Sequence, residues 1–298
     1  MLVRDRLLLL GLTAVWGLNF SVIKIALADM PPLLLAAMRF LLVALPAVWL
    51  LPKPTVPVSH IAAYGLTMFA MQFALLFAGM SLGIGAGVAS LLLQFQVFVT
   101  IALALGFGRE RPSLWQVVGA VIAAGGLAGL VAGAPLDVPG VGLLLVLLAA
   151  VAWGVGNTLS RRLLGGQAVL PSVAWGSLVS VLPLAAASLW LEGWPAWKTA
   201  FVESRTSTWL ALAYVVYPTT LAGFSLWAYQ LRRYPAAAVA PFTMLVPVFG
   251  LLFAALTVGE PMTSAKVTAA VVVLLGVGLC QWGQHLDCLI AAKLPPRT

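Results

Sequence analysis

Two short stretches of the sequence place a tryptophan, a glycine and an amide inside runs that are otherwise aliphatic. The first, AVWGLN, carries Trp16 and Asn19, and the second, AWGVGN, carries Trp153 and Asn157. On a helix, residues three or four apart share a face, so each tryptophan lies beside its amide. An amide offers donors and an acceptor, as the ammonium and carboxylate of an amino acid require, and an indole adds a rigid apolar wall. We predict that the two pairs line one substrate cavity; the alternative is that they only pack neighbouring helices together.

Helical spacing also groups polar and ring side chains in two other apolar runs. Tyr64, Met68 and Gln72 follow one another at intervals of four residues, which predicts a single face of a helix. Tyr214 and Pro218 begin a similar series further along the chain. A polar group is costly in lipid, so we expect both faces to point into the protein.

Two more runs contribute candidates. One holds Ser90 and Gln94 on one helical face, with Gln96 pointing elsewhere, and the other holds Met244. Burial of such a residue does not by itself imply contact with a ligand. The residues that we predict to bind substrate are Trp16, Asn19, Gln72, Gln94, Trp153, Asn157, Tyr214 and Met244.

Charge and proline mark candidate gating positions. Arg39 lies roughly 10 Å into its apolar run by helical rise, where it could bind a substrate carboxylate or tie a gate through helix-end carbonyls. Lys24 and Lys266 are near enough to the ends of their runs to extend to the membrane interface. Pro218 and Pro247 interrupt two runs and predict bending points.

Composition places the chain in a membrane. Its 298 residues are 62% hydrophobic and 8% charged, whereas soluble proteins carry roughly 25% charged residues. The net charge of +8 comes from basic residues scattered between apolar runs, which is typical of cytoplasmic loops and not of a nucleic-acid surface. The two cysteines, Cys280 and Cys288, form no CxxC pair and have no histidine cluster, so we expect neither a metal site nor a cofactor.

The apolar runs have the length of membrane-spanning helices, which need roughly 20 residues each. The ten predicted spans are residues 7–27, 33–51, 58–80, 86–107, 114–132, 140–160, 168–191, 208–231, 236–257 and 265–285. The first is too long for the apolar core of a signal peptide and contains Asn19 and Lys24, so we expect it to be retained. The sequence therefore predicts an all-α integral membrane protein with ten transmembrane helices.

The basic residues predict the orientation of these spans. If the N-terminus is cytoplasmic, eleven lysines and arginines fall in inside segments and only Lys198 and Arg205 fall outside. Positive charge accumulates on the cytoplasmic side of membrane proteins. We therefore predict an inner-membrane protein with both termini in the cytoplasm.

The second half of the chain repeats features of the first. Glu110 and Glu260 follow matching glycines and are 150 residues apart, as are Gly126 and Gly276. With five spans in each half, the second half enters the membrane in the opposite direction. This predicts two inverted five-helix repeats, residues 1–135 and 136–290, with a cytoplasmic tail at 291–298 and a substrate site near the midplane.

Several motifs carry a resemblance to a known family. WGLNF begins at Trp16, MPPLLLAAMRF ends just past Arg39, a Gly-Arg-Glu run ends at Glu110, and LVPV contains Pro247 ahead of Gly-Glu260. In order and spacing these resemble the EamA family of the drug/metabolite transporter superfamily, and especially its bacterial amino acid exporters. The resemblance implies ten helices in two inverted halves and export of amino acids or related metabolites.

Acidic residues bear on the energy source. No aspartate or glutamate falls in the middle of a predicted span. Small multidrug relatives in this superfamily use a first-span carboxylate for proton exchange, whereas this chain has Trp16 and Asn19 in that region. Facilitated export is therefore favoured, and coupling through His60 or through the substrate itself is the alternative.

Other functions fit the sequence less well. A drug or nucleotide-sugar carrier is the nearest alternative, although the missing acid weakens the cationic-drug version. A membrane-embedded enzyme would need reactive side chains grouped near one membrane face, and His60 and His285 are far apart. A purely structural subunit would not need an inverted repeat. We therefore predict a carrier that works as a monomer in the lipid bilayer, exports neutral amino acids by alternating access, and has no nucleic-acid partner.

Overall fold

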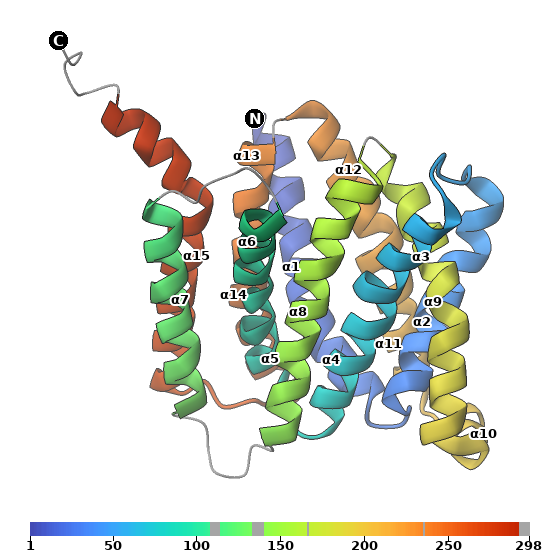
Figure 1. Ribbon diagram of the computed structural model, residues 1–298. Coiled ribbons are helices and arrows are strands. Elements are labelled where there is room, and N and C mark those ends of the chain that lie inside the picture. The colour runs from blue at the N-terminus through green and yellow to red at the C-terminus, as the bar shows by residue number, and fades with distance from the viewer. Residues whose placement is uncertain (108–113, 133–139, 166, 235, 292–298) are drawn as a thin grey trace.

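The computed structural model describes residues 1–107, 114–132, 140–165, 167–234 and 236–291, and all the regular elements in these ranges are helices (Figure 1). The first half contains α1 (Val3–Ala26), α2 (Pro32–Leu50), α3 (Val58–Gly65), the π-helix η1 (Leu66–Met71), α4 (Gln72–Ser81), α5 (Ala86–Leu92), the 3₁₀ turn η2 (Leu93–Phe95), α6 (Gln96–Phe107) and α7 (Leu114–Ala132). The second half contains α8 (Gly140–Leu163), α9 (Val169–Leu191), α10 (Gly193–Glu203), α11 (Thr206–Tyr214), the π-helix η3 (Val215–Ala222), α12 (Gly223–Arg233), α13 (Ala236–Val239), the 3₁₀ helix η4 (Ala240–Met244), α14 (Leu245–Val258) and α15 (Ser264–Ala291). Glu110, the predicted loop at 133–139 and the predicted tail beyond residue 291 lie outside the described ranges.

The prediction of an all-helical membrane protein is confirmed. Seven helical stretches are long and apolar enough to cross a membrane. Three further predicted spans form shorter apolar helices, at Val117–Leu130, Phe242–Val258 and Ser264–Leu279. The structure thus supports a multi-pass bundle, and the count of ten crossings stays a prediction.

Helices of the two halves pack in matching pairs. Helix α2 packs against α9, and α7 packs against α15 at one edge of the bundle (Figure 1). Helix α1 packs against α14, and α8 packs against α4 and α6. In the α7–α15 crossing, a β-carbon on Gly276 would lie 2.5 Å from the backbone oxygen of Gly119, and one on Gly126 would lie 3.0 Å from the backbone nitrogen of Val273. The two glycines that are 150 residues apart therefore sit in one close helix crossing.

Irregular helical turns also recur at matching positions. The π-helices η1 and η3 interrupt the third and eighth predicted spans, and the 3₁₀ segments η2 and η4 interrupt the fourth and ninth. Such turns are short and uncommon within helices and are frequent at functional positions. Pro218 lies inside η3, but η1 contains no proline. Proline is therefore not required for this local widening.

Helix α10 has no counterpart in the first half, where only a short connection joins α2 to α3. Pro46 in α2 and Pro183 in α9 are 137 residues apart, whereas Tyr64 and Tyr214, each just before a π-helix, are 150 apart. The extra residues of α10 account for this change of offset. In Figure 1, α10 lies at the end of α9, away from the N-terminus.

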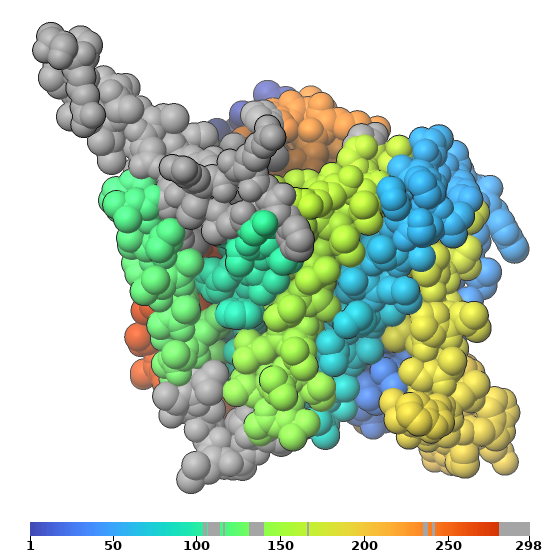
Figure 2. Space-filling model, in the orientation of Figure 1, coloured from blue at the N-terminus to red at the C-terminus, as the bar shows by residue number. Residues whose placement is uncertain are grey.

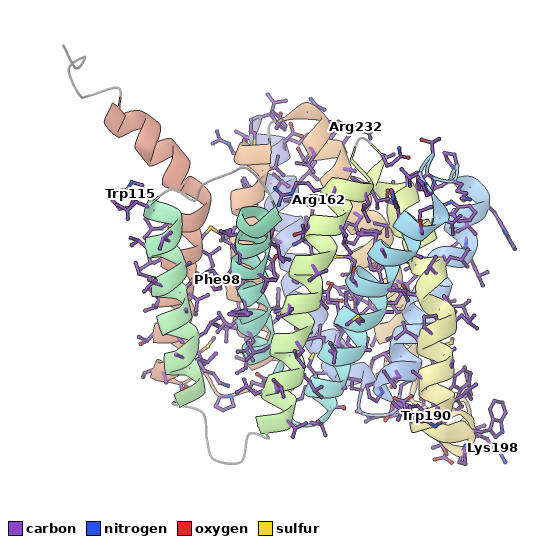
Figure 3. All side chains as sticks on the ribbon, viewed as in Figure 1. Phe98, Trp115, Arg162, Trp190, Lys198 and Arg232 are labelled. Atoms are coloured by element: carbon purple, nitrogen blue, oxygen red, sulfur yellow. The ribbon has the colours of Figure 1, made fainter. Side chains whose placement is uncertain are left out.

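Labelled side chains identify the two ends of the bundle. Arg162 and Arg232 lie at the end that carries the N-terminus, and Trp190 and Lys198 lie at the opposite end (Figure 3). We call the first the terminal end and the second, which carries the turn between α1 and α2, the turn end. On the face shown in Figure 2, side chains of α8, α3 and α9 form a continuous surface between these ends.

Candidate functional site

Trp16 connects α1 to the π-helix η3. Its indole Nε1 donates a hydrogen bond to the backbone oxygen of Thr219, 3.0 Å away. Its ring centroid lies 6.0 Å from that of Phe224 and 5.5 Å from that of Trp227. One residue earlier on α1, the backbone oxygen of Val15 accepts a hydrogen bond from the Tyr214 hydroxyl at 2.9 Å. Two predicted site residues, Trp16 and Tyr214, therefore hold α1 against the eighth span.

The two amides of the predicted site have different surroundings. Asn19 is 7% exposed, and its Oδ1 has no hydrogen-bond partner. Asn157 is half-buried, and its Nδ2 donates to Gln96 Oε1 at 2.9 Å. No hydrogen bond or ring contact joins Trp16 or Asn19 to Trp153 or Asn157 among the described side chains. The shared cavity that we predicted for these pairs stays a prediction.

Gln96 points away from Ser90, as expected, but it meets another polar side chain. The 3₁₀ turn η2 lies between Ser90 and Gln96 and winds the chain by about 120° per residue instead of 100°. Ser90 therefore faces α14, where a β-carbon on Gly250 would lie 2.7 Å from Ser90 Cβ. Gln96 faces α8, and Thr100 one turn later lies 3.5 Å from the Asn157 amide nitrogen. Gln96 and Thr100 were not among the residues predicted to bind substrate, because their partner Asn157 lies on a helix about 60 residues away.

A π-helix also breaks the predicted face of the third span. Tyr64 faces α9, with its ring 3.1 Å from a β-carbon placed on Gly176. Met68 faces α8, with its sulfur 2.9 Å from a β-carbon placed on Gly156. Because η1 changes the residues per turn, these two side chains and Gln72 do not form one stripe. Gln72 itself is 4% exposed, and its Oε1 has no partner.

The eighth span shows the same effect. Tyr214 is half-buried against α1, whereas Pro218 is exposed. The expectation that both residues point into the protein was therefore wrong for Pro218, because Pro218 lies within η3, which changes the rotation of the chain after Tyr214. Pro247 in α14 is buried. The gating roles of both prolines stay predictions.

The remaining predicted residues lie on the irregular segments or against the main core. Gln94 lies in η2 and is 9% exposed. Met244 ends η4 and packs, partly buried, against the main hydrophobic core, as does Trp153. Gln94 and Met244 are 150 residues apart, so the repeat relates them.

Arg39 is a buried cation within α2. It is 3% exposed, and its Nη2 donates to Thr220 Oγ1 at 3.1 Å. Its guanidinium carbon lies 4.3 Å from the ring centroid of Phe73 and 5.6 Å from that of Phe40. Its Nε and Nη1 have no hydrogen-bond partner. In the described ranges no carboxylate pairs with Arg39, and Asp29 with Arg205 forms the ion pair found there.

The second half has no cation at the corresponding place. Gly176 follows Arg39 by 137 residues, the offset that relates α2 to α9. A β-carbon on Gly176 would lie 2.8 Å from Phe69 and 3.1 Å from Tyr64. Aromatic rings of the third span thus occupy the space that corresponds to the Arg39 side chain. The bundle can therefore pack this crossing without a charge.

Small residues bring three helices together toward the turn end. A β-carbon on Gly17 would overlap Cβ of Phe249 and lie 2.9 Å from the backbone nitrogen of Gly250. A β-carbon on Gly87 in α5 would lie 2.8 Å from Leu251 in α14. With Ser90 against Gly250, α1, α5 and α14 form one tight crossing.

Charged side chains secure the same end. Glu260 accepts hydrogen bonds from the backbone nitrogens of Ala86 and Gly87, at 2.5 and 3.3 Å, and so caps α5. Gly259, with φ of 67°, provides the left-handed turn that ends α14 just before it. Lys24 Nζ donates to the backbone oxygen of Ile84 at 3.3 Å. Lys24 therefore contacts the loop that precedes the helix capped by Glu260.

Carboxylates also fix the turn between α1 and α2. Glu192 at the end of α9 accepts from the backbone nitrogens of Leu33 and Leu34, at 2.7 and 3.0 Å. Asp29 accepts from Arg205 Nη2 at 2.8 Å and from the hydroxyl of Thr208. The hydrogen bond from Arg205 holds the pKa of Asp29 well below its usual range. Sequence analysis did not indicate these roles, because each partner is more than 150 residues away.

The described residues contain no group of three or more histidine, cysteine or acidic side chains that could hold a metal ion. What they offer a ligand is a set of buried amides and hydroxyls, one buried cation and aromatic walls. This chemistry suits recognition of a small polar molecule.

Known proteins resemble the chain over nearly its whole length. A model of the EamA-like transporter family matches residues 6–132 and 140–280. The "Probable amino-acid metabolite efflux pump" of Salmonella typhimurium is 38% identical over 286 residues, which cover 94% of this chain and 95% of that protein. A protein of the same name from Escherichia coli strain K12 is also 38% identical, with the same coverage. A solved structure titled "Crystal structure of protein" covers 97% of this chain and 99% of its own, with a TM-score of 0.67 and 18% identity, so it shares the fold.

Proposed function

Because this chain belongs to the EamA-like transporter family, whose model matches both halves, we propose that it exports neutral amino acids and related metabolites across the bacterial inner membrane. The observation that carries this proposal is the 38% identity, over nearly the full length, to efflux pumps named for amino-acid metabolites. The buried amides in the bundle are consistent with such a substrate, since they can hydrogen-bond its ammonium and carboxylate groups.

The proposed mechanism is alternating access between two inverted halves. The pairing of α1 with α14, and of α8 with α6, supports it, as do the matching π and 3₁₀ segments. At the turn end, α5 is packed against α14 and capped by Glu260. Toward the terminal end, α6 packs chiefly against α8. We infer a state that is closed at the turn end, which the charge distribution assigns to the outside.

The proposed carrier is a monomer that needs no coupling ion. The sequence has no acidic residue in the middle of a span to carry a proton. Asn19 and Trp16 stand where the superfamily's proton exchangers have a carboxylate. The proposed substrate contacts are Trp16, Asn19, Gln72, Gln94, Trp153, Tyr214 and Met244, with Arg39, Lys24, Pro218 and Pro247 in gating or charge roles. Asn157, whose amide is bonded to Gln96, is proposed to hold α8 against α6 instead.

The test is transport by the purified protein in liposomes that contain nothing else. Each of the twenty amino acids is screened with and without a pH gradient, and empty liposomes are the control. We expect flux of a subset of neutral amino acids, driven by their own gradient and unchanged by pH. If no amino acid moved while a cationic dye did, the chain would be a multidrug exporter and the proposal would fail. Acceleration by a pH gradient would overturn the facilitated mechanism.

Orientation has its own test. A reporter fused after Arg162 should be found in the cytoplasm, and one inserted in residues 133–139 should be found outside. The reverse result at both positions would place the closed turn end on the cytoplasmic side.

A further inference from the structure

Several buried side chains in the described residues have polar atoms without a partner, and four of them lie on four adjoining elements. They are Asn19 Oδ1 on α1, Nε and Nη1 of Arg39 on α2, Gln72 Oε1 on α4 and Thr219 Oγ1 on η3. Their side chains are 7%, 3%, 4% and 4% exposed, respectively. Helix α1 packs against α4 and η3, and α2 packs against the same two elements. Arg39 contacts Thr220 and Phe73, the neighbours in sequence of Thr219 and Gln72. Trp16, one turn before Asn19, is bonded to the backbone of Thr219. The four residues therefore belong to one region of the bundle.

Unpaired buried polar atoms are unfavourable, and a membrane interior supplies no water to satisfy them. Native proteins rarely keep several of them together without a functional reason. Two of these four residues were expected to bind substrate from the sequence alone, and Arg39 was expected to carry charge. The region thus has the properties of a site that a ligand completes.

The charge of Arg39 is the clearest sign of what that ligand is. Thr220 accepts from one of its nitrogens, and the ring of Phe73 covers its face. Nε and Nη1, which lie on the two different edges of the guanidinium, are both left without an acceptor among the described residues. Each edge pairs one of them with Nη2, which has two hydrogens and donates one to Thr220, so one edge keeps the two parallel donors that bind a carboxylate.

The inverted repeat supplies an internal comparison. At the position that corresponds to Arg39, the second half has Gly176 with rings from Tyr64 and Phe69 beside it. The second half therefore forms the equivalent helix crossing without a charged side chain. A purely structural role does not account for a buried cation at the other crossing.

The free groups also divide into two chemical kinds. Arg39 offers only donors, whereas the free atoms of Asn19 and Gln72 are amide oxygens, which only accept. An α-amino acid presents the complementary set, since its carboxylate accepts and its ammonium donates. We propose that Arg39 binds the substrate carboxylate and that Asn19 and Gln72 bind its ammonium.

This inference rests on the proposed export function and narrows its substrate class. The substrates are zwitterions that carry a free carboxylate and a free ammonium. Amines without a carboxylate, such as cationic drugs, lack the group that Arg39 binds.

The test compares three forms of each amino acid: the free acid, the carboxamide and the N-acetyl derivative. Binding to the full-length protein in detergent is measured from the rise in melting temperature with ligand concentration. We expect the free acid to bind roughly 10- to 100-fold more tightly than either derivative. Equal affinity for free acid and carboxamide in the unaltered protein would overturn the assignment of Arg39.

Substitutions assign each group of the ligand to a residue. Arg39→Gln should remove the preference for free acid over carboxamide and keep the preference for free amine over N-acetyl. Asn19→Leu should remove the preference for free amine over N-acetyl and keep the preference for free acid over carboxamide. Arg39→Lys keeps the charge and should keep the acid preference. Lys266→Gln, which removes a half-buried cation bonded to the backbone oxygen of Pro261, should change neither preference. If Arg39→Gln retained the acid preference, the proposal would be wrong.

The same panel separates this inference from the proposed function. Binding with both preferences but without transport in liposomes would count against export and would support the site. Transport without a preference for the free acid would support export and would refute the site. A merely structural role for Arg39 predicts a lower melting temperature in Arg39→Gln with both preferences intact.

Discussion

The two Trp-Gly motifs make the same helix contact in opposite halves of the molecule. Gly17 lets α1 approach α14 at Phe249, and Gly154 lets α8 approach α6 at Val99. Phe249 and Val99 are 150 residues apart, so the contacts are equivalent. A β-carbon would lie 2.9 Å from a backbone nitrogen at Gly17 and 2.6 Å from the Val99 Cβ at Gly154. The glycine is therefore the structural part of the motif.

The other members of the motif have diverged. Trp16 is hydrogen-bonded to η3, whereas Trp153 makes no hydrogen bond to the rest of the described chain. Asn19 keeps a free oxygen, whereas Asn157 is bound to Gln96. The comparison therefore separates two roles. The glycines pack helices together in both halves, whereas of the two amides only Asn19 keeps a buried oxygen free for a ligand.

The largest expected effect is a loss of stability at the helix contact that the two Trp-Gly motifs share. Gly17→Ala and Gly154→Ala should each lower the free energy of unfolding by about 3 kcal/mol, because the new methyl group would overlap a neighbouring helix. Gly11→Ala is the matched control on α1, since nothing lies within 4 Å of its β-carbon position. Denaturant unfolding in detergent measures all three. A mild effect at one of the two motif glycines would break their equivalence.

The second effect is on transport. Asn19→Leu should reduce apparent substrate affinity by roughly 30-fold, about 2 kcal/mol, because it removes a ligand acceptor. Its melting temperature should not fall, since Oδ1 has no partner to lose. Uptake into liposomes and thermal unfolding provide the two readouts. Loss of stability with normal transport would show that Asn19 packs helices, as Asn157 does.

Asn157→Leu should instead lower stability and leave transport unchanged, and its effect should be about half as large. It leaves Gln96 Oε1 without its amide donor, so stability should fall by about 1 kcal/mol. The double variant Asn157→Leu with Gln96→Leu should recover most of this loss, because neither partner remains unpaired. Additive losses in the unfolding experiment would show that the two residues are not coupled.

The smallest effect concerns the indoles. Trp16→Phe removes the hydrogen bond to Thr219 and should cost about 1 kcal/mol. Trp153→Phe removes only packing area and should cost less. Thermal unfolding of the pair gives the difference, and a larger loss for Trp153→Phe would reverse the comparison.

The sequence predicted correctly those features that depend on a local run of residues or on a spacing repeated along the chain. Apolar runs of membrane length identify helices, because a backbone in lipid must satisfy its own hydrogen bonds. The glycines 126 and 276 could be matched because the repeat preserves their spacing, and the structure places them in one crossing. The family was recognisable for the same reason, and the family match confirms it.

Side-chain partners were harder to predict, and the errors have a single cause. The stripe of Tyr64, Met68 and Gln72 assumed 3.6 residues per turn, which the π-helix η1 changes. The same assumption placed Pro218 on the inward face of Tyr214, whereas the π-helix η3, which begins after Tyr214, leaves Pro218 exposed. No proline or glycine pattern within η1 indicates the change.

The sequence by itself determined the membrane class, the helices and the internal repeat, because these depend on the hydropathy and spacing of each segment. Only the tertiary structure decided that, among the described residues, Arg39 has no carboxylate partner and Asn19 keeps a free oxygen, and that Glu260 caps α5. Those facts depend on how distant helices meet. A hydrogen bond needs its partner within about 3 Å, and a rotation of one residue in a helix decides which neighbour comes within that distance.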